Sequence, residues 1–106
     1  MKKTSFIIQG SQKVKTSIGD YKNVWSDLGV VSGYLDLITG TDVNTLQKAI
    51  IEQSTHVAVL TPFPTFTIKD GMRFVHDNRY YTITYADDPV GQQHHMELYL
   101  TFGGKL

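Results

Sequence analysis

The chain has no cysteine, and its ten basic residues balance its ten acidic residues. Without cysteine there is no disulfide and no thiolate chemistry. A net charge near zero argues against a dedicated duplex-binding protein, because phosphate neutralisation dominates that affinity. It also leaves little long-range self-repulsion, which suits a protein that associates with copies of itself.

Long apolar runs are also missing. The run behind the basic start, Phe6-Ile7-Ile8, is too short for the apolar region of a signal peptide, and no stretch can span a bilayer. We therefore expect no signal peptide and no membrane partner. With 106 residues, we expect one domain, 1–106, built around a single core.

Motifs that carry chemistry are absent as well: the sequence has no Gly-rich phosphate loop, nucleophile elbow or zinc motif. His94 and His95 are adjacent, and on a strand their rings point to opposite faces, so they cannot bind one ion together. Asp87-Asp88 precede Pro89, where an aspartate commonly caps a turn, and no partner base accompanies them. We predict no catalytic residue, no bound metal and no cofactor, and hence a protein that is not an enzyme.

The clearest structural signal is a β-hairpin with Asp77-Asn78 as its two-residue loop, a pair that tolerates the positive φ values of a type I′ turn. Counting outwards places Arg73 opposite Thr82 and Phe74 opposite Tyr81. A slip of one residue would reverse the faces of one arm of the hairpin. The residues expected on the core face are Met72, Phe74, Tyr81, Ile83 and Tyr85.

Alternating apolar residues predict several further strands. The segments are Ser5–Gln9, then Val14–Ile18 after a Gly10-Ser11 turn, Tyr21–Ile38, Thr55–Thr61, and Met96–Phe102 with Phe102 facing inwards and Gly103-Gly104 fraying. Gly29 and Gly33 mark a bulge or sharp bend, or else relieve crowding beside Trp25. The pattern predicts an all-β fold, a small antiparallel β-barrel or sandwich with a long loop or short helix at about 39–54.

The segment at 39–54 has a character of its own. Val43, Leu46, Ala49 and Ile50 recur at helical offsets behind Asp42, a candidate N-cap. The apolar stripe is narrow and most polar residues are uncharged, so a short helix and an irregular loop fit equally well. Segments of this length between strands are usually functional or mobile.

Tyrosines offer one further possibility, because small barrels stack single-stranded bases on aromatic rings. With Tyr81 and Tyr85 expected in the core, only Tyr80 and Tyr99 remain outside, and few basic residues accompany them. Exposed, rigid tyrosines are equally good anchors for protein contacts. We therefore favour protein contact over nucleic-acid stacking.

Short motifs throughout the chain resemble the head-to-tail joining family of long-tailed bacteriophages, and more narrowly its head-completion or "stopper" proteins. These motifs are Trp25, Gly33-Tyr34-Leu35-Asp36, Lys48-Ala49, Thr55-His56-Val57, Met72-Arg73-Phe74, Asn78-Arg79-Tyr80-Tyr81-Thr82-Ile83, Asp88-Pro89 and Glu97-Leu98-Tyr99-Leu100. The order and spacing of the extended segment Tyr21–Ile38, the Arg-containing hairpin and the final Asp88-Pro89 carry the likeness.

The resemblance implies a structural virion protein without enzymatic activity, which forms a ring of about twelve copies below the portal and adaptor. In such proteins the long loop projects towards the channel and retains packaged double-stranded DNA by steric contact only. Carried over to this sequence, the channel loop comprises Thr39, Gly40, Thr41, Asp42, Val43, Asn44, Thr45, Leu46, Gln47, Lys48, Ala49, Ile50, Ile51, Glu52, Gln53 and Ser54.

The implied partners are further copies of the chain, the portal or adaptor protein and a tail completion protein. The implied location is the head–tail connector of the virion of a phage or prophage, with the bacterial host cytoplasm during assembly. The candidate assembly contacts are Trp25, Tyr34, Arg73, Arg79, Tyr80 and Tyr99. Two alternatives stay open: a barrel that binds single-stranded nucleic acid, and a small carbohydrate- or peptide-binding module.

Overall fold

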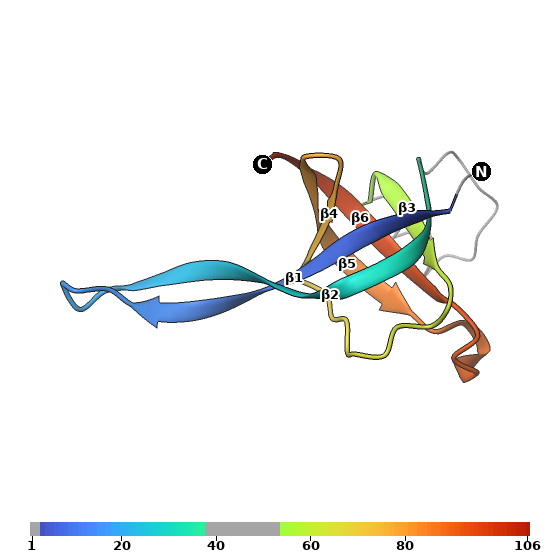
Figure 1. Ribbon diagram of the computed structural model, residues 1–106, viewed down its shortest axis with the longest axis horizontal. Coiled ribbons are helices and arrows are strands. Elements are labelled where there is room, and N and C mark those ends of the chain that lie inside the picture. Colours follow the sequence, from blue (N-terminus) through green and yellow to red (C-terminus); the bar gives the residue numbers. More distant parts are fainter. Residues whose placement is uncertain (1–2, 38–53) are drawn as a thin grey trace.

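The computed structural model describes residues 3–37 and 54–106, and within them the chain folds into six strands and one short 3₁₀ helix (Figure 1). The elements are β1 (Thr4–Lys15), β2 (Tyr21–Leu37), β3 (His56–Leu60), β4 (Arg73–His76), β5 (Arg79–Asp87), η1 (Pro89–Gly91) and β6 (Met96–Lys105). Neighbouring strands pair antiparallel in the order β1-β2-β3-β6-β5-β4, and β4 returns to β1 to close a barrel. The predicted all-β barrel is confirmed.

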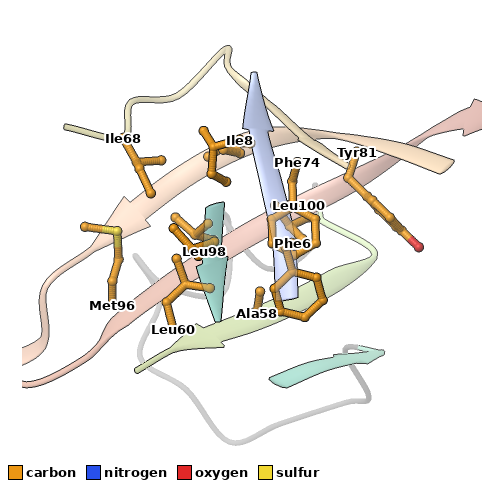
Figure 2. Close-up of a cluster of buried hydrophobic side chains, with 12 residues drawn as sticks. Phe6, Ile8, Ala58, Leu60, Ile68, Phe74, Tyr81, Met96, Leu98 and Leu100 are labelled. Carbon is orange, nitrogen blue, oxygen red and sulfur yellow. The ribbon is translucent and has the colours of Figure 1, made fainter. Parts of the chain in front are cut away.

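Apolar side chains that alternate along the strands fill the barrel (Figure 2). Met96 and Ile68 lie at one end of this core and Tyr81 at the other. The side chains with less than 2% of their surface exposed are Phe6, Phe74, Ile8, Leu60, Ile83, Leu98 and Leu100.

The β4–β5 hairpin has the predicted turn and register. Asp77 and Asn78 have φ values of 52° and 61°, as a type I′ turn requires. Arg73 pairs with Thr82 and Phe74 with Tyr81, and the amide of Ile83 donates to the Met72 carbonyl at 2.9 Å. Met72 packs on the core beside three buried neighbours, Phe74, Tyr81 and Ile83.

The prediction fails for Tyr85, whose side chain is 41% exposed instead of packed in the core. The pairing of β5 with β6 shifts between Ile83 and Tyr85, where a bulge inserts one residue. An extra residue reverses the faces of everything that follows it. The alternation of inward and outward side chains therefore holds up to Ile83. The inserted residue then turns Tyr85 outwards.

The predicted turn at Gly10-Ser11 is also wrong. β1 continues through both residues, and the chain reverses only at Thr16–Asp20, where the Asp20 carbonyl accepts from the Thr16 amide at 2.6 Å and Gly19 has a φ of 92°. Beyond Gly10 and Ser26 neither strand pairs with a third strand. Residues 10–26, here called the arm, therefore form a two-stranded ribbon that projects from the barrel (Figure 1).

The end of β6 departs from the prediction as well. Gly103 and Gly104 continue the strand, with Gly104 paired to Tyr80, instead of fraying. Phe102 is 45% exposed, although its ring still contacts the buried Tyr81 ring at a centroid distance of 5.6 Å. A second register shift between Tyr80 and Tyr81 accounts for the rotation of this segment.

Two glycines allow β2 to curl into the barrel. A Cβ on Gly33 would lie 1.9 Å from the Val59 carbonyl oxygen of β3. Gly29 pairs with Ile8 beside the β1–β2 register shift, and a Cβ there would lie 2.6 Å from the Phe66 ring. Gly29 therefore marks the predicted bulge, whereas Gly33 allows the close approach of β3. The atoms nearest to a Cβ on either glycine belong to Phe66, Val59 and Leu60, and not to Trp25.

Candidate functional site

Three of the candidate assembly residues meet in one stack on the outside of the barrel. The Arg73 guanidinium carbon lies 4.2 Å from the ring centroid of Trp25 and 4.2 Å from that of Tyr80. Both separations are within the range of a cation–π contact. These three residues, here called the Arg73 stack, join β2, β4 and β5 at the point where the arm leaves the barrel.

The strand pairing explains the position of each side chain in this stack. Arg73 lies opposite Thr82, and Tyr80 is two residues before Thr82 on the same face of β5. Next to β5, Gly103 leaves space for the Tyr80 ring, because a Cβ there would lie 2.2 Å from the ring atom Cε2. The absence of a side chain at Gly103 in the last strand thus leaves room for the Tyr80 ring of the stack.

The face of the arm that carries Trp25 continues this surface. Trp25 pairs with Ser11, and two-residue steps along the ribbon bring Lys13, Lys15 and Tyr21 to the same face. Tyr21 is 67% exposed. The surface formed by Lys13, Lys15, Tyr21, Trp25 and Arg73 is here called the basic strip.

A second surface lies on the outer face of β5 and β6. Tyr85 pairs with Tyr99 and Asp87 with Glu97, and the two tyrosine rings have centroids 6.2 Å apart. The Tyr99 hydroxyl donates to Glu97 Oε2 at 3.1 Å. These four residues are here called the acidic patch.

Burial and the neighbouring carboxylates raise the pKa of Tyr99 to about 12, with burial the larger cause and Glu97 the next. Both effects favour the neutral phenol over the phenolate. Tyr99 therefore remains a hydrogen-bond donor to Glu97 well above neutral pH.

The remaining candidate assembly residues fall in different places. Tyr34 pairs with Val59, and Val59 pairs in turn with Glu97, so that Tyr34 lies on the outer face two strands from the acidic patch. Arg79 follows the hairpin turn and pairs with His76 and Lys105. Of the six residues, three thus form the Arg73 stack, Tyr99 lies in the acidic patch, and Tyr34 and Arg79 lie apart from both.

His94 and His95 do not point apart as predicted. Their Nδ1 atoms are 3.2 Å apart, because the segment precedes β6 and Gln93 adopts a left-handed φ of 55°. His95 Nε2 lies 3.5 Å from Glu97 Oε1. Within residues 3–37 and 54–106, no group of three or more histidine, cysteine or acidic side chains could hold a metal ion.

The aspartates before Pro89 have the divergent positions expected of them. Asp88 accepts a hydrogen bond from the Gln93 amide at 3.0 Å, which is a turn-capping contact, whereas Asp87 ends β5 opposite Glu97. The two adjacent carboxylates therefore belong to different elements, Asp88 to the turn and Asp87 to the end of β5.

The predicted channel loop, 39–54, lies outside the described residues except for Ser54. The Ser54 side chain is buried, and its hydroxyl lies 2.8 Å from the hydroxyl of Thr84, which donates in turn to the Tyr99 carbonyl. On the other side of the loop, Leu37 pairs with His56. The two ends of the segment thus leave the barrel side by side.

Sequence reasoning missed the basic strip and the acidic patch as continuous surfaces. Lys13 and Lys15 alternate in the sequence, but the false turn at Gly10-Ser11 separated them from Trp25. The bulge before Tyr85 could not be read from the alternation pattern. Both surfaces depend on register, which becomes visible only when strands are paired.

In the described part of the chain, no helix is both long and apolar enough to cross a membrane. No curated protein matches the chain. The profile of the family described as "Phage head completion protein" matches residues 4–101, which is nearly the whole chain and all six strands in part or in full. The chain therefore belongs to the phage head completion protein family, and it is a structural protein of the phage virion.

Proposed function

We propose that this protein is one domain, 1–106, that forms a ring below the portal and adaptor of a phage or prophage. The ring closes the DNA channel and offers the surface to which the tail attaches. The protein assembles in the host cytoplasm, associates with portal, adaptor and tail completion proteins, and has no enzymatic activity. Membership of the head completion family is the observation that carries this proposal.

The points at which the proposed channel loop joins the barrel support the closing role. Leu37 and His56 are paired, so the described residues on either side of the loop lie together at one end of the barrel. An out-and-back path gives each limb about eight residues, which reach roughly 26 Å when extended. A loop of that reach from each copy could obstruct a channel without gripping the DNA, and its uncharged polar composition fits steric contact.

The test is replacement of residues 39–54 by a two-residue Asn-Gly turn, which can join adjacent antiparallel strands in the register set by the Leu37–His56 pair. We expect the shortened protein to fold and to bind a portal–adaptor complex, while particles completed with it lose packaged DNA. Particles completed with the full chain are the control. DNA retention by the shortened protein would remove the channel-loop role, and failure of the full chain to bind the complex would overturn the proposed function.

The second candidate function is binding of single-stranded nucleic acid, which the basic strip favours because cations and aromatic rings alternate along it. Against it, the Trp25 and Tyr80 rings each turn one face to Arg73 and cannot stack a base there. Titration with an unstructured oligonucleotide decides between the two functions. Micromolar binding that weakens with added salt, together with no portal–adaptor binding, would reverse the order.

A further inference from the structure

We propose that the basic strip of one copy docks on the acidic patch of a second copy, so that the arm is the element that links neighbouring subunits. This inference deepens the proposed function, since it names the two surfaces by which copies in a ring would meet. It rests on that function for the ring, but the contact itself can be tested on the free protein.

Most charges of the two surfaces are unmatched within the described residues, and Glu97, which has Tyr99 and His95 beside it, is the exception. Lys13 and Lys15 make no ion pair there, and the Arg73 guanidinium has no hydrogen-bond acceptor, only its two rings. Asp87 has neither an ion pair nor a hydrogen bond in the described part of the chain. It also lies directly opposite Glu97, an arrangement of like charges that destabilises a sheet until a cation joins it.

The chemistry of the two surfaces is complementary. The Arg73 guanidinium carbon lies 4.2 Å from the ring centroids of both Trp25 and Tyr80, and the N–H groups of Arg73 can pair with a carboxylate in a bidentate manner. Tyr85 and Tyr99 offer aromatic faces and Asp87 offers a carboxylate to incoming lysines. A second copy therefore supplies what each surface lacks.

Shape and length agree with this pairing. Six residue pairs of the arm extend past the barrel, about 20 Å at the usual rise per residue, and the short axes of the molecule measure 27 Å. The arm is thus long enough to cross most of a neighbour. An isolated two-stranded ribbon is at best marginally stable in water, and Tyr21 and Ile18 on it are 67% and 82% exposed.

The two surfaces lie on different parts of the molecule, the arm and the outer face of β5 and β6 (Figure 1). A contact between different surfaces of identical copies is heterologous and repeats from copy to copy, closing into a ring where the rotation permits. Two unlike docking surfaces on one chain are what such an assembly requires.

Charge reversal gives the first test. One variant carries Lys13→Glu with Lys15→Glu, and the other carries Asp87→Lys with Glu97→Lys. Each alone places like charges at the contact, so we expect self-association on a portal–adaptor complex to fall at least tenfold. An equal mixture restores it, because the reversed arm of the first variant meets the reversed patch of the second, and the unchanged arm of the second meets the unchanged patch of the first. A variant with all four changes restores it as well.

The matched control is Lys22→Glu with Lys69→Glu, which changes the net charge equally. Lys22 lies on the other face of the arm and Lys69 lies in the loop before β4. We expect this variant to associate like the wild type. Equal loss in the control, or no recovery in the mixture, would overturn the docking proposal.

The absence of cysteine permits a second test on the free protein at high concentration. Asn23→Cys places a thiol on the strip face beside Lys13, and His95→Cys places one beside Glu97. We expect a disulfide between the two variants when they are mixed. In the control mixture, Val24→Cys replaces Asn23→Cys and presents its thiol on the opposite face, so it should crosslink at least tenfold less.

The outcomes separate this inference from the proposed function. If the wild type fails to bind the portal–adaptor complex but the thiols crosslink, the proposed function fails and the docking contact stands. If the wild type binds the complex but neither crosslinking nor charge recovery occurs, the contact is overturned and the function stands. If the variant with Lys13→Glu and Lys15→Glu loses oligonucleotide binding, and no contact between copies is detected, the basic strip binds nucleic acid instead.

Discussion

The barrel and the arm share two strands, β1 and β2, yet different interactions hold the two regions in place. Within the barrel, Phe6 and Ile8 of β1 are 1% and 0% exposed and pack against side chains from every other wall. In the arm, nearly every side chain is exposed, and the main link to the barrel is the contact of Trp25 with Arg73. A continuous strand is therefore not equally stable along its whole length. The hydrophobic core ends where β1 and β2 no longer pair with a third strand.

The largest difference between the two regions is expected when a side chain is shortened in the core of the barrel. Phe74→Ala should lower the free energy of unfolding by about 3–5 kcal/mol, because a fully buried ring leaves a cavity. Val14→Ala in the arm should change it by about 0.5 kcal/mol or less. Denaturant unfolding measures both, and equal losses would mean that the arm belongs to the cooperative core.

A smaller effect is expected at the joint between the two regions. Arg73→Ala removes two cation–π contacts and should cost about 1–2 kcal/mol. Since Trp25 is the only tryptophan, its fluorescence reports this joint alone. We expect its emission to shift towards that of solvated indole and its anisotropy to fall, while Arg73→Lys retains part of both signals. Unchanged emission would show that the stack does not fix the arm.

High pH should lower the free energy of unfolding through Tyr99, which lies on the outer face of β6. Its pKa is raised from 10 to about 12 in the folded protein, so the folded state holds the phenol proton more tightly than the unfolded state. The stability that this provides is present below pH 10 and is lost as the pH rises towards 12. The free energy of unfolding should fall less steeply with pH across this range in Tyr99→Phe than in the wild type. An identical pH profile in the two proteins would contradict the assigned cause.

The smallest effect is expected from His56 at low pH. Burial, and then the nearby positive charge of Arg79, lower the pKa of His56, while Asp36 acts in the opposite direction. The folded state thus favours the neutral ring, so this contribution is present above about pH 6.5 and decreases as the pH falls below it. In His56→Gln the free energy of unfolding should fall less steeply as the pH decreases below about 6.5. A steeper fall would mean that the pKa of His56 is raised by folding instead of lowered.

Alternation and turn chemistry were sufficient to predict the barrel. The Asp77-Asn78 turn fixed its own register, and the predicted core face of the hairpin is correct from Met72 to Ile83. The prediction failed at the bulge before Tyr85, because one inserted residue leaves no mark in the pattern of polar and apolar side chains.

The candidate site was predictable only as a set of residues. Trp25, Arg73 and Tyr80 were named individually, but their contact depends on the pairing of β1 with both β2 and β4 and on the space above Gly103. Glycine in a strand can signal a bulge, a bend or a fraying end, and the sequence alone does not distinguish these for Gly10 or Gly103.

The pairing of Leu37 with His56 has a thermodynamic consequence for the segment between them. Because the barrel already holds the two ends together, the cost of lengthening this segment is only that of closing a longer loop, about 0.6 kcal/mol for each doubling of its length. Insertions and deletions there should be nearly neutral for folding. The length of the segment can therefore change while the barrel sequence stays the same.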